Sequence, residues 1–139
     1  MAIKLTTTRE AAQSNGIKML VYGGAGSGKT TLASTTGANA LIISAESGLM
    51  SLRDHDIDAI EVSSFDEVFE AYKFVESGDG TKYDWVCLDS LSEIAETCLA
   101  AEKKTNQDPR AAYGETAEKM LRLIKAFRDL PGRNIYMSA

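Results

Sequence analysis

The stretch that decides the fold is residues 17–32, IKMLVYGGAGSGKTTL. It begins with an apolar run, passes through a glycine-rich turn and continues into residues that favour a helix. Residues 23–30 fit the phosphate-binding loop pattern G-x-x-x-x-G-K-[ST] at every fixed position. Glycines allow backbone conformations that are closed to residues with a Cβ atom. The N–H groups of such a loop can therefore point at phosphate oxygens, together with the positive end of the following helix.

The loop predicts a site for a nucleoside triphosphate. Lys29 is expected to reach the β- and γ-phosphates and to act in catalysis, and the Thr30 hydroxyl is expected to ligate Mg²⁺. A dinucleotide-binding G-x-G-x-x-G interpretation fails, because Lys29 stands where the third glycine should be. The residues predicted to bind the nucleotide are Gly23, Gly24, Ala25, Gly26, Ser27, Gly28, Lys29, Thr30 and Thr31.

The composition favours one globular domain. The chain has 139 residues, of which 44% are hydrophobic and 25% charged. No apolar run approaches the ~20 residues that a membrane helix needs, so we expect no membrane partner. The N-terminal residues lack the apolar core of a signal peptide, which predicts a cytoplasmic protein.

Charge and cysteine content exclude some further classes. The formal net charge of −5 argues against a protein that coats DNA, although a local basic groove remains open. Cys87 and Cys98 form neither a C-x-x-C motif nor a ligand cluster, and we expect two buried thiols.

Hydrophobic patterning divides the chain into an N-terminal arm at residues 1–16 and a core at residues 17–139. Five short apolar runs predict strands at residues 19–22, 40–44, 58–62, 84–89 and 134–138. Helices are expected at residues 29–36, 49–53, 64–77 and 90–104, and a long helix up to residue 130 is expected after a polar loop at residues 105–113. Alternating strands and helices predict a three-layer α/β/α sandwich around a mainly parallel five-stranded sheet. Ligands of such sheets bind at the carboxyl ends of the strands.

Two acidic residues follow predicted strands at that edge. Asp89 ends the run WVCLD, and Ser90 can cap the next helix, which leaves the Asp89 carboxylate free for the Mg²⁺ shell. Glu46 follows the strand directly after the loop helix and could activate the attacking water. A strand-terminal cap at Asp89 and a solvated loop glutamate at Glu46 are the plainer alternatives.

A basic segment lies further along the chain. Lys103, Lys104 and Arg110 flank a polar loop before Tyr113, and cations beside an aromatic ring suit single-stranded nucleic acid. The alternative is a solvated helix end whose cations complement the helix dipole.

The chain resembles the RecA-like core of phage-encoded P-loop ATPases, which are AAA-family nucleotide-binding proteins of the single-strand annealing and recombination group. The resemblance rests, in order, on GGAGSGKTT, LIISAESG, WVCLDSLSE, YGETAEKMLRLIKAFRDLP and NIYMSA, and it runs from about residue 17 to the end. It implies that Glu46 is the catalytic glutamate, that Lys29 and Thr30 are the P-loop pair, and that Asp89 is the Walker B aspartate. The segment from Lys103 to Tyr113 then falls at the first DNA-facing loop.

The same resemblance implies ATP and Mg²⁺ as cofactors, and ATP or ADP, single-stranded DNA and further copies of the chain as partners. In the family, the last strand leads into a γ-phosphate-sensing residue and a second DNA-binding loop. Neither follows residue 139, which predicts a RecA-like core truncated at its C-terminal side. An exposed edge at the last strand would favour self-association.

These residues are consistent with three alternative functions. The first is an ATPase acting in phage DNA recombination or annealing, with Glu46 activating water for attack on the γ-phosphate. The second is a nucleotide-gated binding module with little or no hydrolysis. The third, a small-molecule kinase, needs a lid with arginines, and the arginine-poor stretch at residues 47–84 argues against it.

Overall fold

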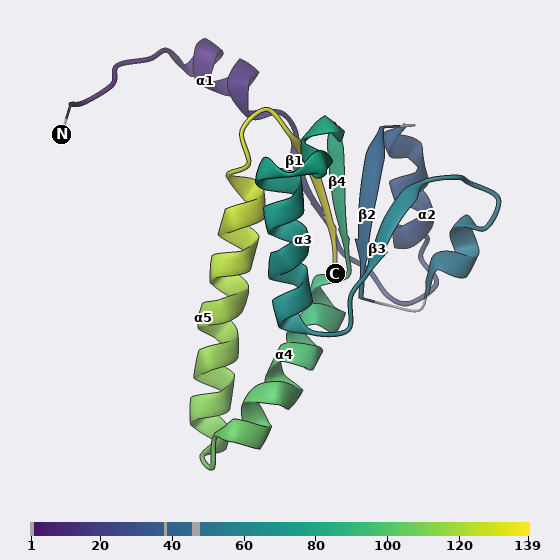
Figure 1. The fold of residues 1–139 in the computed structure, drawn as a ribbon, viewed down its shortest axis with the longest axis vertical. Coiled ribbons are helices and arrows are strands. Elements are labelled where there is room, and N and C mark those ends of the chain that lie inside the picture. Colours follow the sequence, from purple (N-terminus) through teal and green to yellow (C-terminus); the bar gives the residue numbers. More distant parts are fainter. Residues whose placement is uncertain (1, 38, 46–47) are drawn as a thin grey trace.

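The computed structural model describes residues 2–37, 39–45 and 48–139 as an α/β domain (Figure 1). Besides its helices and strands, the domain has three short 3₁₀ turns, at Ser34–Thr36, Gly48–Leu52 and Asp79–Lys82. The helices are α1 Thr8–Asn15, α2 Lys29–Ala33, α3 Phe65–Ser77, α4 Leu91–Thr105 and α5 Pro109–Arg128. The strands are β1 Lys18–Val21, β2 Ala40–Ser44, β3 Asp58–Glu61, β4 Trp85–Asp89 and β5 Asn134–Ser138.

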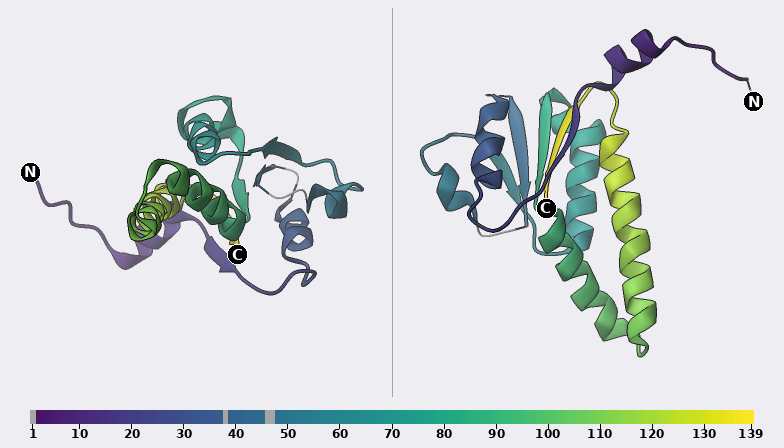
Figure 2. Two further views of the ribbon diagram at one scale, coloured as in Figure 1. Left: turned by 90° about the horizontal axis from the view of Figure 1, so that it is seen from below. Right: turned by 180° about the vertical axis from the view of Figure 1, so that it is seen from behind.

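The five strands form one parallel sheet in the order β1-β5-β4-β2-β3. This confirms the predicted α/β class and the parallel five-stranded sheet, and every predicted strand is present to within one residue at each end. Helix α2 lies on one face of the sheet, and α3, α4 and α5 cover the other (Figures 1 and 2). The three predicted layers are therefore present.

Two apolar clusters hold these layers together, because alternate residues of a strand point to opposite faces of the sheet. Leu41, Val86 and Ile135 lie in the larger cluster, under α3, α4 and α5. Ile42, Cys87 and Tyr136, each one residue further along, lie in the smaller cluster with Ala33 of α2. The central strands are thus buried on both faces, as their continuous apolar runs predict.

Serine caps begin two of the three long helices, as the capping-box spacing predicts. The Ser64 hydroxyl accepts a hydrogen bond from the backbone N–H of Glu67 at 3.2 Å, and the Ser90 hydroxyl accepts one from that of Glu93 at 3.3 Å. Since Ser90 caps α4, Asp89 just before it is available for other contacts.

The prediction that the last strand leaves an exposed edge of the sheet is wrong. Strand β5 pairs with both β1 and β4, and the edge strands are β1 and β3. Strand order depends on how each crossover packs against the sheet, which the order of elements along the chain does not specify.

Two helix starts also differ from the predictions. The expected polar loop at residues 105–113 is shorter, because Asp108 accepts a hydrogen bond from the Arg110 N–H and Pro109 occupies the first turn of α5. Arg110 and Tyr113 therefore lie on α5. In the N-terminal segment, Thr7 caps an unpredicted helix, α1, and residues 2–6 extend away from the domain (Figure 1).

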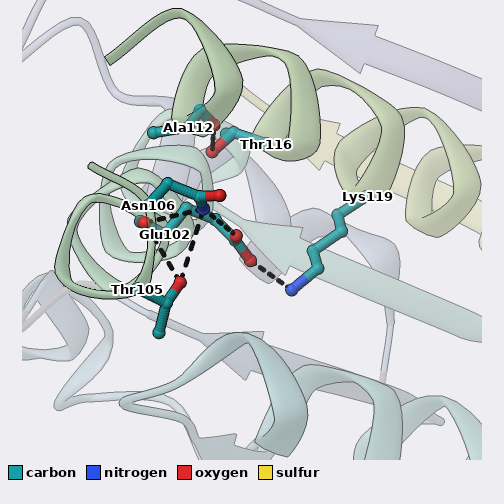
Figure 3. Close-up of polar contacts among 6 residues, drawn as sticks. All are labelled: Glu102, Thr105, Asn106, Ala112, Thr116 and Lys119. Atoms are coloured by element: carbon teal, nitrogen blue, oxygen red, sulfur yellow. Dashed lines mark hydrogen bonds and ion pairs between the residues drawn. The ribbon is translucent and has the colours of Figure 1, made fainter. Parts of the chain in front are cut away.

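Helices α4 and α5 form a hairpin that projects past the carboxyl ends of the strands (Figures 1 and 2). Glu102 of α4 joins the two helices near the tip of this hairpin (Figure 3). Its carboxylate accepts hydrogen bonds from the Lys119 ammonium of α5 and, at 3.1 Å, from the Asn106 amide. The hydrogen bond to Glu102 raises the pKa of Lys119. The side chain of Glu102 is only 11% exposed, so its charge depends on these partners.

We predict that Glu102→Gln lowers the free energy of unfolding by about 1–2 kcal/mol, because hydrogen bonds to a charged group are stronger than neutral ones. Urea unfolding at neutral pH measures the change. Glu70→Gln is the matched control, since Glu70 pairs with Lys73 at 3.4 Å while its side chain is 73% exposed. The control should change stability by less than about 0.5 kcal/mol, and equal effects of the two variants would contradict the role of Glu102.

Candidate nucleotide-binding site

The phosphate-binding loop connects β1 to α2 at the carboxyl edge of the sheet. Gly26 and Gly28 have φ angles of +79° and +91°, conformations that L side chains rarely adopt. A Cβ atom on either residue would meet no neighbouring atom within 4 Å, so the loop's outer side is open. The backbone conformation, rather than crowding, therefore requires glycine at these two positions.

A hollow of about 380 Å³ lies over this loop. Its lining brings together seven of the nine residues predicted to bind nucleotide, Ala25 to Thr31. Ser51, on the 3₁₀ turn after β2, completes the lining. No sequence motif marks Ser51, because it reaches the loop only through the packing of that turn against α2.

Lys29 is held at the carboxyl ends of β1 and β5. Its ammonium group donates hydrogen bonds to the carbonyl oxygen of Gly23 and, at 3.0 Å, to that of Ala139. The ammonium group therefore lies against the base of the loop, where β1 and β5 end.

Asp89 brings the loop together with two strands of the sheet. Its carboxylate accepts a hydrogen bond from the Thr30 hydroxyl at 2.9 Å and one from the Ser138 hydroxyl at 2.8 Å. Thr30 and Asp89 are 59 residues apart in the chain, and the fold places them side by side as the candidate magnesium site requires. Asp89 is 2% exposed, so these two hydroxyls provide the hydrogen bonds that a buried carboxylate needs.

The family model for an AAA domain matches residues 15–139, most of the chain. The chain belongs to the AAA domain family. Membership agrees with the loop geometry and supports a P-loop nucleotide-binding domain. A search of curated proteins finds no match. The phage and recombination parts of the resemblance stay predictions.

The side-chain oxygen atoms beside the loop are of the kind that binds Mg²⁺. Thr30 and Asp89 offer a hydroxyl and a carboxylate, which are hard oxygen donors, and Mg²⁺ usually keeps several waters and binds few protein oxygens beside phosphates. Within the described ranges, no group of three His, Cys, Asp or Glu side chains could hold a metal ion. These residues fit a metal that arrives with its nucleotide rather than a metal bound by the protein alone.

Two further side chains lie under the loop helix. The Tyr136 hydroxyl donates a hydrogen bond to the Lys29 carbonyl at 2.6 Å. Burial, followed by the negative charge of Asp89, raises the pKa of Tyr136, which keeps this donor protonated. Burial also raises the pKa of the neighbouring Cys87 thiol to about 12, partly offset by a hydrogen bond with Thr36.

The residues predicted to contact DNA lie away from the phosphate-binding loop. Glu46 lies outside the described residues. Lys103, Lys104, Arg110 and Tyr113 lie on the α4–α5 hairpin, where the Lys103 ammonium lies 5.3 Å from the centre of the Tyr113 ring. The described helices include none with the length and apolar character to cross a lipid bilayer.

We predict that neither thiol of the native domain reacts with Ellman's reagent at pH 8. Cys87 and Cys98 are 0% and 2% exposed, and burial raises the pKa of both, so almost no accessible thiolate is present. The measurement is thiol titration before and after addition of 6 M guanidinium chloride, the denatured sample being the positive control. Fast reaction of Cys87 in the native state would mean that α2 separates readily from the sheet, and fast reaction of Cys98, on α4, would mean that α4 and α5 separate from each other.

Proposed function

We propose that this domain binds ATP with Mg²⁺ in the loop of residues 23–31 and hydrolyses it. The observation that carries the proposal is the hydrogen bond between Thr30 of the loop helix and the buried Asp89 at the end of β4. A hydroxyl from the loop and a carboxylate from a neighbouring strand are the two protein groups that hold Mg²⁺ in P-loop nucleotidases.

The proposed roles follow from the chemistry of each group. The loop N–H groups and the Lys29 ammonium bind the phosphates and offset the charge that builds up on the γ-phosphoryl group. Bound Mg²⁺ would supply further charge neutralisation at the β- and γ-oxygens. Thr30 and Asp89 would hold that ion, and Glu46 would orient the attacking water and accept its proton.

We predict that Glu46→Gln abolishes turnover but leaves ATP affinity within about threefold, because an amide cannot accept the proton while the loop contacts remain. Steady-state phosphate release and calorimetric ATP binding measure the two effects. Lys29→Ala is the contrasting variant and should lose nucleotide binding itself. Bound nucleotide without turnover in the unmodified protein would favour a nucleotide-gated binding module instead.

We also propose that the domain acts on single-stranded DNA in phage recombination or annealing, with the α4–α5 hairpin as the contact. Support comes from the position of the hairpin, which projects past the same carboxyl edge of the sheet at which the phosphate-binding loop lies (Figures 1 and 2). Lys104, Arg110 and Tyr113 are exposed there, and phosphate contacts together with base stacking on an aromatic ring are typical of single-strand binding.

Self-association is part of the same proposal. The outer edge of β1 has no paired strand among the described residues, and Met19 and Leu20 on it are 41% and 57% exposed. An exposed apolar strand edge is a surface on which another chain can pair.

For DNA binding, we predict that the double variant Lys103→Ala/Lys104→Ala weakens affinity for single-stranded DNA and flattens its salt dependence. Two lost phosphate contacts would reduce the slope of log K against log salt by about 1.4. Fluorescence anisotropy at several salt concentrations measures both quantities. Lys73→Ala/Lys125→Ala removes the same charge from exposed positions outside the hairpin tip and is the control. An unchanged slope in the hairpin variant would remove this surface from the proposal.

A further inference from the structure

Strand β5 carries two buried hydroxyl groups, those of Tyr136 and Ser138, and neither residue was predicted to belong to the site. Tyr136 and Ser138 are two residues apart, so both point to the face of the sheet that α2 covers. Their exposed fractions are 2% and 0%. Buried hydroxyls are retained where they make hydrogen bonds, and both of these bind to parts of the nucleotide site.

The Ser138 hydroxyl acts on Asp89. It lies 2.8 Å from Oδ1 of Asp89, whereas Thr30 occupies Oδ2 at 2.9 Å. The Leu88 carbonyl at 3.3 Å is a more distant second acceptor for the same hydroxyl. Two donors, one on each oxygen, oppose rotation of the carboxylate about its own bond. Without Ser138, Oδ1 would lose this donor in a buried site.

The Tyr136 hydroxyl acts on a different part of the site. Its hydrogen bond at 2.6 Å joins β5 to the backbone of Lys29, the first residue of α2. It therefore restrains the position of the loop helix, and its hydrogen bond is made to the Lys29 backbone rather than to the Asp89 carboxylate.

We propose that Ser138 is a positioning residue that orients Asp89 for the Mg²⁺ that accompanies bound nucleotide, while Tyr136 positions the phosphate-binding loop itself. The inference rests on the proposed role of Asp89 in holding Mg²⁺. Strand β5, which lies between β1 and β4, is thus the element that sets the carboxylate against the loop. Loss of the Ser138 hydroxyl should therefore affect ATP affinity only when Mg²⁺ is present, whereas loss of the Tyr136 hydroxyl should affect it with or without the metal.

The test is calorimetric titration of ATP with Mg²⁺ and, separately, with EDTA, on unmodified protein and on Ser138→Ala. Groups that orient a metal ligand typically contribute 10–100-fold to metal affinity. We expect Ser138→Ala to reduce the Mg²⁺-dependent gain in ATP affinity by about 10-fold, with affinity in EDTA within about twofold. Tyr136→Phe should lower both affinities by the same factor, about 2- to 10-fold.

Thr116→Ala is the matched control. Thr116 is also a buried hydroxyl, 8% exposed, but it donates to the Ala112 carbonyl within α5, away from the loop (Figure 3). It should leave both affinities unchanged. Should Ser138→Ala fail to fold, Ser138→Cys takes its place, because a thiol keeps the volume and donates only weakly. The Cys variant must show the same selective loss.

An unchanged Mg²⁺-dependent gain in the folded Ser138 variant would overturn the inference, and so would an equal loss with and without metal. Failure of the proposed function has a different signature. In that case the unmodified protein would itself show no gain in ATP affinity from Mg²⁺, whatever residue stands at position 138.

Discussion

The buried carboxylate of Asp89 is the constraint on which the site depends. A charge that is 2% exposed is tolerated only with hydrogen-bond partners, and here they come from α2 and β5. The same two hydrogen bonds therefore satisfy a charge and fix the relative positions of the loop helix, β4 and β5. These hydrogen bonds thus contribute both to the stability of the fold and to the geometry of the site.

Strand β5 contains none of the predicted site residues, yet it contacts several parts of the site. It separates the strand that enters the loop from the strand that ends in Asp89, so the loop and the carboxylate meet across it. Tyr136 binds the loop helix and the Ala139 carbonyl accepts from Lys29. The backbone N–H of Gly23 also donates to Ala139, at 3.2 Å. The end of β5 therefore lies against the base of the phosphate-binding loop.

The base of the α4–α5 hairpin packs on the sheet through the larger apolar cluster, whereas its tip lies beyond the strands. Near the tip, the Glu102–Lys119 pair cross-links the two helices. A hairpin held in this way presents Lys103 and Tyr113, which are in contact with each other, as one exposed cationic and aromatic surface. Any partner of the hairpin tip would thus meet this cation and this aromatic ring.

Local physical rules let the sequence determine the loop, the five strands and the two serine caps, because glycine conformations, apolar runs and capping spacing act over a few residues. The sequence also predicted Thr30 and Asp89 as members of one site, and the structure brings them together. It did not predict the strand order, which depends on packing between distant elements. For the same reason Ser51, Tyr136 and Ser138 could not be found from their neighbours in sequence. Their partners lie on other elements, and only the tertiary structure decided that they meet the loop and Asp89.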